Sequence, residues 1–205
     1  MLLLRWRNAL RSLRSTRTAG IILSLAIIAP TFGAATDARL VECLNCHAPT
    51  GTAHTALTPY LGGQPAFFVL TQLFLFRGER RDSAPMIQIM KGVSDGDMQL
   101  LSDAVAKLPP PAPPAKPRDK TRFDRGRALA KEHRCTICHN PDFSGKDQVP
   151  RLANQREEYL LKALRDFKSG KRLGYGGAMA GELTGLSDAD LVDLAHYATH
   201  LAPVR

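Results

Sequence analysis

The chain has 205 residues, enough for one large or two small domains, and a formal net charge of +9. Five of its 28 basic residues are arginines within the first 17 positions, which leaves 23 basic against 19 acidic residues and a net charge of +4. No basic stripe with interleaved aromatic residues is present, so the composition gives little support to a nucleic-acid-binding protein.

The first 35 residues have the composition of a secretory signal. A basic start without acidic residues precedes an apolar run from Ala19 to Ala29, and the small residues Gly33, Ala34 and Ala35 follow. We therefore expect export and cleavage after Ala35. An uncleaved membrane anchor stays open as the alternative, because the uncharged stretch 18–36 has 19 residues and a membrane span needs about 20.

Two five-residue motifs contain all four cysteines, Cys43-Leu44-Asn45-Cys46-His47 and Cys135-Thr136-Ile137-Cys138-His139. Cys-x-x-Cys-His is typical of c-type haem attachment. Residues three and four apart share one face of a helix, so both thiols can bond to one porphyrin while the next histidine binds its iron. A four-cysteine zinc site and two disulfides are the alternatives. Zinc sites usually have closer cysteine pairs than these, which begin 92 residues apart. The motifs predict two covalently bound haem c groups.

The motifs belong to an internal repeat, with copies at about 37–108 and 121–203. A Pro-x-Leu-x-x-Gln segment at 59–64 returns at 150–155, an offset of 91 residues. Between the copies, the proline-rich segment 109–117 cannot form a helix or a central strand, because proline has no amide hydrogen. We expect a semi-rigid polyproline linker there, with a recognition motif for another protein as the alternative. The predicted domains are 36–108 and 121–205, joined by a linker at 109–120.

Three helices are predicted in each copy, and neither copy shows the alternation typical of strands, so the predicted fold class is all-α. The first helix carries the haem motif; it starts six residues before Cys43 in one copy and runs over 123–133 in the other. The second covers about 65–76 and 157–167. The expected cap residues are Gly78 and Gly170 after the second helix and Ser94 and Ser187 before the third.

A methionine opposite the histidine would complete each iron site and raise its reduction potential. The second copy has only Met179 for this role, eight residues before Ser187. Eight residues before Ser94 stands Met86. The sequence therefore predicts iron ligation by Met86 and Met179. Met90 fails this count and is not expected to bind iron, whereas Met98 aligns with Leu191 and is expected to pack in the core.

Two prolines are candidates to orient the haem histidines. Pro59 follows His47 by 12 residues and Pro150 follows His139 by 11. Their carbonyl groups can accept the outer ring N–H, which fixes the tautomer and strengthens the ligand, although ordinary turn prolines would look the same. The remaining histidines are expected on the surface or on helix faces: His54, His133, His196 and His200.

The complete pattern resembles the two-haem class I cytochromes of the cytochrome c4 type. It consists of a Pro-x-Leu-x-x-Gln loop, an apolar helix ending at Phe and Gly, a methionine, Ser-Asp and a last helix, all present twice. The resemblance implies two cytochrome c folds face to face, with haem edges near their interface and electron transfer in the periplasm. The site residues that it carries over are Cys43, Cys46, His47, Met86, Cys135, Cys138, His139 and Met179.

In one respect the first copy departs from this family. Such domains usually cross their first and last helices through a glycine against an aromatic residue, and Gly126 and Tyr197 match this in the second copy. The first copy has no such glycine, and Ala104 stands where the tyrosine would be.

The expected function is an electron carrier between a dehydrogenase or quinol-oxidising complex and a terminal oxidase, not a catalyst. A dedicated haem subunit of a flavoprotein dehydrogenase is the first alternative. A two-haem peroxidase or a haem gas sensor would need an open iron, whereas this chain offers a methionine for both irons.

The second helix of the first copy predicts a docking surface. Charged residues of the second copy are replaced there by Phe67, Phe74 and Leu75. Spacings of seven and eight residues suggest one apolar helical stripe, and exposed apolar patches usually mark partner sites. Coverage of the stripe by the linker or by the second domain is the alternative.

Overall fold

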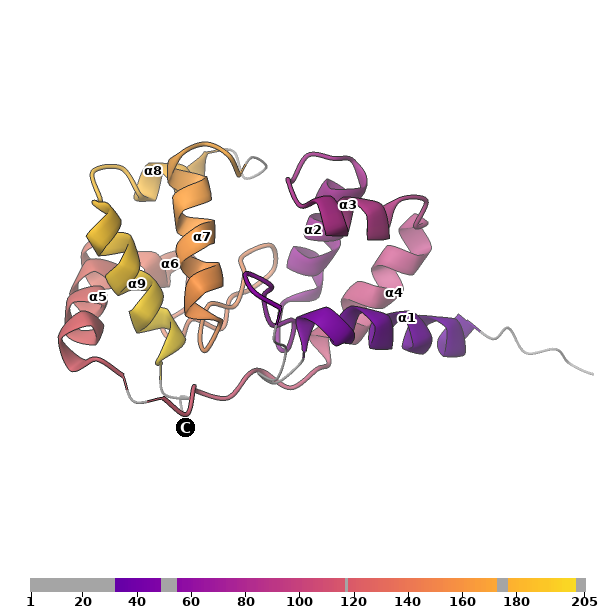
Figure 1. The fold of residues 1–205 in the computed structure, drawn as a ribbon, viewed down its shortest axis with the longest axis horizontal. Helices are drawn as coiled ribbons and strands as arrows, with labels where there is room; N and C mark the ends of the chain where they lie inside the picture. The colour runs from indigo at the N-terminus through magenta and orange to yellow at the C-terminus, as the bar shows by residue number, and fades with distance from the viewer. Residues whose placement is uncertain (1–31, 49–54, 117, 173–176, 202–205) are drawn as a thin grey trace, which may run out of the picture. The chain divides into compact units, whose positions relative to one another are not determined.

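The structure, a computed structural model, describes residues 32–48, 55–116, 118–172 and 177–201. Every named element in these ranges is a helix, which confirms the all-α class (Figure 1). The first half (residues 32–108) contains α1 Phe32–His47, α2 Ala66–Arg77, α3 Ala84–Met90 and α4 Asp95–Ala106. The second half (residues 118–201) contains α5 Lys120–Glu132, α6 Cys135–His139, α7 Glu157–Lys168, α8 Ala178–Glu182 and α9 Asp188–Thr199. No helix in the described ranges combines the length and the apolar character that a membrane span requires.

The haem motif is part of the first helix in the first half, whereas it forms a separate short helix in the second half. In the first half, α1 runs unbroken through the motif and begins at Phe32, before the predicted start at Asp37. In the second half, α5 ends at Glu132, and Arg134 adopts a left-handed φ of 50° before α6 begins. Most of the predicted signal, 1–31, lies outside the described residues, so cleavage after Ala35 stays a prediction.

Serine caps begin the last helix of both halves, as predicted. The Ser94 side chain accepts a hydrogen bond from the Asp97 N–H at the start of α4. At the start of α9, Ser187 and Asp190 form a complete capping box. These bonds satisfy main-chain N–H groups that have no partner within the helix.

Helix α2 has its predicted glycine cap, whereas the C-cap of α7 lies one residue before the predicted Gly170. Gly78 is the C-cap of α2, with φ −87°, and the next residue, Glu79, takes the left-handed φ of 54°. In the second half Ser169 is the C-cap and Gly170 takes the left-handed position, with φ 73°. Glycine is favoured there because it has no Cβ to clash.

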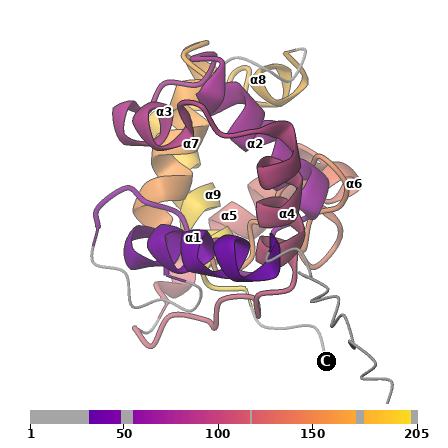
Figure 2. The same cartoon turned by 90° about the vertical axis from the view of Figure 1, so that its right-hand side faces the viewer.

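In the second half, α5 and α9 cross in direct contact at Gly126, as predicted. A Cβ at Gly126 would lie 2.2 Å from the Asp193 carbonyl oxygen and 2.7 Å from the Tyr197 Cβ, so only glycine allows this approach. The Tyr197 ring meets the Phe123 ring edge-on, with centroids 5.0 Å apart. In the first half α1 packs against α4 (Figures 1 and 2). The residue of α4 that corresponds to Tyr197, Ala104, is half-buried.

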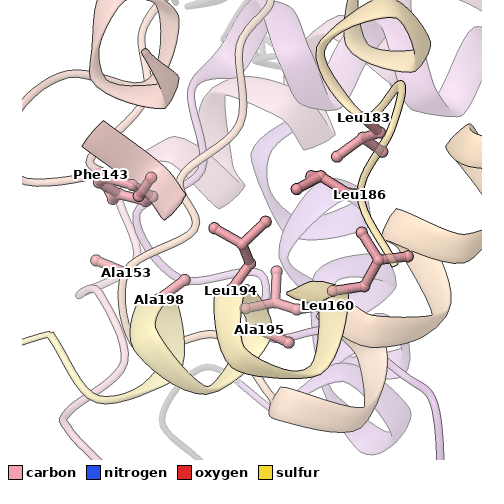
Figure 3. Close-up of a cluster of buried hydrophobic side chains, with 10 residues drawn as sticks. Phe143, Ala153, Leu160, Leu183, Leu186, Leu194, Ala195 and Ala198 are labelled. Atoms are coloured by element: carbon pink, nitrogen blue, oxygen red, sulfur yellow. The ribbon is translucent and has the colours of Figure 1, made fainter. Parts of the chain in front are cut away.

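Each half has its own buried apolar clusters. The second half contains the larger one, to which α7 contributes Leu160 and α9 contributes Leu194 and Ala195 (Figure 3). In the first half, Met90 is 2 % exposed and Met98 is 1 % exposed. Both methionines therefore pack in the core, which was predicted for Met98.

The linker contains no helix over 109–116. It runs against the first half, where Gly63 donates its N–H to the Leu108 carbonyl oxygen at 3.0 Å. A Cβ at Gly63 would lie 2.9 Å from the Pro110 Cβ, so the proline-rich segment packs closely on this glycine. The described residues pack as one unit, and side chains of the two halves contact each other.

Candidate functional site

All four cysteines of the motifs are free thiols. Cys43 and Cys135 are half-buried, and burial raises the pKa of both thiols. Their partners Cys46 and Cys138 are exposed. The structure thus contains neither of the two disulfides considered from the sequence. Within the described ranges, the four cysteines also do not form a cluster that could hold zinc.

The two motif histidines make equivalent hydrogen bonds. The Nδ1 atom of His47 lies 3.0 Å from the Pro59 carbonyl oxygen, and Nδ1 of His139 lies 3.0 Å from that of Pro150. A carbonyl oxygen can only accept, so each Nδ1 carries the proton and each Nε2 keeps a lone pair. Burial lowers the pKa of both rings, against the opposing effect of these hydrogen bonds. A neutral ring with a free Nε2 is the form that binds a metal.

The candidate methionine ligands lie on two short helices that the sequence analysis missed. Met86 is on α3 and Met179 is on α8. Both side chains are half-buried and pack against the apolar cluster of their own half. These helices have seven and five residues, too few to show a helical period in the sequence. The repeat nevertheless places Met86 and Met179 on equivalent elements.

An unsatisfied guanidinium atom lies beside one of the haem motifs. Arg151 directly follows Pro150, the residue that binds His139, and its Nε is buried without a hydrogen-bond partner among the described residues. Burial lowers the pKa of this guanidinium group. A haem carries two propionate carboxylates that could accept this N–H. Free thiols, imidazole lone pairs and this unsatisfied donor therefore fit haem c.

Two glutamines that the sequence analysis left without a role join the halves. The Gln64 side chain donates to the Arg151 carbonyl oxygen and accepts the Arg151 N–H, both at 3.0 Å. The Gln155 side chain donates to the Tyr60 carbonyl oxygen at 2.9 Å and accepts the Tyr60 N–H at 2.8 Å. Both glutamines end the repeated Pro-x-Leu-x-x-Gln segment. Their occurrence in both copies was the feature of the sequence that could have indicated a shared role.

His196 was predicted as a surface or helix-face residue, but it is only 4 % exposed. Its Nε2 accepts the Asp119 N–H at 3.0 Å, so Nδ1 carries the proton and donates to Glu157 at 2.9 Å. Ligand atoms of Glu157, His196 and His200 lie within 4.8 Å of one another. Both ring nitrogens of His196 are engaged in hydrogen bonds, so neither is free to bind a metal. We therefore interpret this group as a structural link between α9, α7 and the start of α5. His133 and His200 are half-buried, and His54 lies outside the described residues.

Two of the three predicted docking residues are exposed. Phe67 is 55 % exposed and Phe74 is 50 % exposed, but Leu75 is only 6 % exposed. The inclusion of Leu75 was wrong because seven residues complete almost two helical turns, whereas the eighth points about 80° further round. Next to the phenylalanine pair, the Arg77 guanidinium lies 5.4 Å from the centre of the Phe74 ring.

The sequence is similar to those of known proteins across both halves of the chain. A family model described as cytochrome c matches residues 123–202. A cytochrome c4 from Azotobacter vinelandii is 26 % identical over 181 residues, which cover 80 % of this chain and 86 % of that protein. A thiosulfate dehydrogenase electron acceptor from Stutzerimonas stutzeri is 27 % identical over 177 residues, 82 % of each chain.

The fold is also similar to that of a solved structure. This structure is the crystal structure of reduced recombinant cytochrome c4 from Pseudomonas stutzeri. The superposition covers 82 % of this chain and 98 % of the cytochrome c4 chain, with a TM-score of 0.73 and 24 % sequence identity. The two Cys-x-x-Cys-His motifs and the similarity to cytochrome c4 together indicate two covalently bound haem c groups.

Proposed function

We propose that this chain, which belongs to the two-haem class I cytochromes of the cytochrome c4 type, receives electrons from a periplasmic dehydrogenase and delivers them to a terminal acceptor. The exposed pair Phe67 and Phe74 on α2 carries this proposal, since an electron carrier without a catalytic role needs a surface that its partners recognise. The similarity to an electron acceptor of thiosulfate dehydrogenase favours a dehydrogenase of inorganic sulfur compounds as the donor.

Bound haem c would supply one-electron exchange at its iron. The residues that would attach it are Cys43, Cys46, Cys135 and Cys138. His47 and His139 would bind the irons through Nε2, with their Nδ1 protons held by Pro59 and Pro150. Met86 and Met179 would be the second protein ligands of the irons, which would leave neither iron open to peroxide or to a gas ligand.

We further propose that the haem domains extend over 36–108 and 121–205, joined by the linker 109–120. Residues 1–35 would act as a signal that directs the chain to the periplasm. Membrane attachment through an uncleaved signal remains the alternative. Mass spectrometry of the native protein tests this proposal, because cleavage gives a chain that begins at Thr36.

The docking surface combines apolar contact with neighbouring positive charge. Arg80 is exposed just after the helix, whereas Arg77, beside Phe74, is paired with Asp95 at 2.6 Å. An apolar patch with a basic neighbour fits a partner whose own patch is bordered by acidic groups, because complementary charge speeds encounter. Such encounters are short-lived, as an electron carrier that exchanges partners requires.

Stopped-flow reduction of the purified oxidised protein tests the donor. A thiosulfate dehydrogenase is expected to reduce it with a rate that saturates as the dehydrogenase concentration rises. The Phe67→Glu/Phe74→Glu double variant should keep its haem content and lose at least tenfold in this rate. Leu100→Glu, which changes an exposed leucine on α4, is the matched control and should keep the rate. Equal rates in all three proteins would contradict docking at this surface.

The same assay separates the alternative partners. Fast reduction by a quinol–cytochrome c oxidoreductase but not by the dehydrogenase would place the carrier after a quinol-oxidising complex. Co-purification with a flavoprotein dehydrogenase at constant stoichiometry would instead indicate a dedicated haem subunit of that enzyme.

A further inference from the structure

Two arginines occupy equivalent positions after the second helix of each half, Arg81 and Arg172, at the repeat offset of 91 residues. Each donates its main-chain N–H to the carbonyl group six residues earlier in the helix. Each guanidinium group lies 4.5 Å from the centre of an equivalent ring, Phe76 in the first half and Phe167 in the second. The repeat has therefore kept both the residue and its conformation.

The two guanidinium groups converge where the halves meet. The Gln72 Oε1 accepts a hydrogen bond from Arg81 at 2.5 Å and another from Arg172 at 3.3 Å. Arg81 also donates to the Tyr159 hydroxyl of the second half at 3.0 Å. Gln72 is only 5 % exposed, so two positive charges from different halves share one buried neutral oxygen.

The pKa of Tyr159 indicates a positive electrostatic potential around the two guanidinium groups. Burial raises the pKa of Tyr159, yet the charges of Arg81 and Arg172 outweigh that effect and lower the pKa to about 8. Among the described residues, no carboxylate forms an ion pair with Arg81. Two like charges in a partly buried position repel each other more strongly than in water. The arrangement is therefore suited to an anion.

The charge of the pair would act on any haem whose propionates it holds. A nearby positive charge disfavours the ferric form of a haem relative to the ferrous form, because the ferric form carries one more positive charge.

We propose that Arg81 and Arg172 form a carboxylate-binding pair that holds haem propionates where the halves meet and raises both reduction potentials. The proposal rests on the assignment of two haem c groups but not on any partner protein. Guanidinium groups suit this task because they bind carboxylates through two parallel hydrogen bonds and keep their charge. Gln72 and Tyr159 would hold the two side chains in place.

Spectroelectrochemical titration of the isolated protein tests the pair. In Arg81→Gln and Arg172→Gln, the ratio of reduced to oxidised haem at a fixed applied potential should fall threefold to tenfold, where tenfold corresponds to about 59 mV for one electron. The matched controls are Arg80→Gln and Lys171→Gln, which remove the same charge from the exposed neighbouring positions. They should change the ratio less than 1.5-fold. Equal shifts in variants and controls, or no shift in either, would overturn the proposal.

Two further measurements address folding and the source of the anion. Gln72→Glu keeps both arginines and offers them a competing carboxylate, so it should also lower the ratio; an unchanged ratio would contradict the proposal even if the arginine variants fail to fold. A free inorganic anion is the other possible occupant. Wild-type potentials that depend on phosphate at constant ionic strength would identify that anion instead and overturn the assignment to propionates. Haem content, measured first, separates these outcomes from loss of the haem assignment itself.

Discussion

Gln64 and Gln155 make the same pair of hydrogen bonds in opposite directions between the two halves. Each side-chain amide binds both the N–H and the carbonyl oxygen of one residue in the other half, at distances of 2.8 to 3.0 Å. The two contacts are related by the internal repeat, as in an interface where one surface patch is used twice. Because the amides are neutral, these contacts stabilise the junction at any ionic strength.

Removal of either amide should loosen this junction. Gln64→Ala and Gln155→Ala each leave a main-chain N–H and a carbonyl group without their partner, so each should lower the free energy of unfolding by about 1–3 kcal/mol. Urea denaturation followed by circular dichroism measures the change. Gln88→Ala, at an exposed position on α3, is the control and should stay within about 0.5 kcal/mol of the wild type. Losses of the same size in all three would argue against a role at the junction.

The ligand assignment predicts different results for two methionines four residues apart. Met86→Leu should abolish about half of the methionine-to-iron charge-transfer absorbance of the oxidised protein, since one of two such bonds is lost. Met90→Leu should keep the absorbance and cost less than about 1.5 kcal/mol of stability, because it is a volume-conserving change in the core. Loss of the band in the Met90 variant would overturn the assignment of Met86.

The helix crossing in the second half depends on one glycine. Gly126→Ala would push a methyl group against Asp193 and Tyr197, and should destabilise the protein by about 1–3 kcal/mol or more. Gly96→Ala on α4 is the matched control, because the nearest atom to its Cβ, the Ser94 Oγ, lies 3.9 Å away. The control should leave stability unchanged or raise it by up to about 1 kcal/mol. Thermal unfolding of both variants distinguishes a tight crossing from an ordinary helical glycine.

Local chemistry in the sequence was enough to predict several features. The serine caps at Ser94 and Ser187 and the proline-rich linker have a local cause, whereas the crossing at Gly126 was expected only from the resemblance to a known family. The two His–Pro hydrogen bonds were also expected from the loop spacing. The prediction that His196 lies on the surface or on a helix face failed because its burial depends on contacts between distant segments. Its hydrogen-bond partners come from α7 and from the residue before α5. The short helices α3 and α8 were missed because one or two turns leave no periodic pattern.

The link between Glu157 and His196 should give stability a defined pH dependence. Burial raises the pKa of Glu157, but hydrogen bonds from His196 and Arg122 outweigh this and hold it below its ordinary 4.5. A lowered pKa contributes stability that is present above pH 4.5 and is lost as the pH falls through the folded-state pKa. Glu157→Gln should therefore destabilise the protein at pH 7, and the difference from the wild type should shrink below pH 4.5.

Urea denaturation between pH 3 and pH 7 measures this dependence. Glu158→Gln, at the neighbouring and more exposed position, is the control and should show a smaller difference from the wild type at every pH. A Glu157→Gln deficit of constant size across this range would show that the carboxylate charge does not stabilise the fold.

The central claim is that the chain is a two-haem electron carrier in which both irons have two protein ligands. Reductive titration of the purified protein under carbon monoxide tests it most directly, because it counts electrons and detects open irons in one experiment. The expected result is uptake of two electrons per chain, with a reduced spectrum identical to that recorded without carbon monoxide. Uptake of one electron, or a spectrum shifted by bound carbon monoxide, would contradict the account.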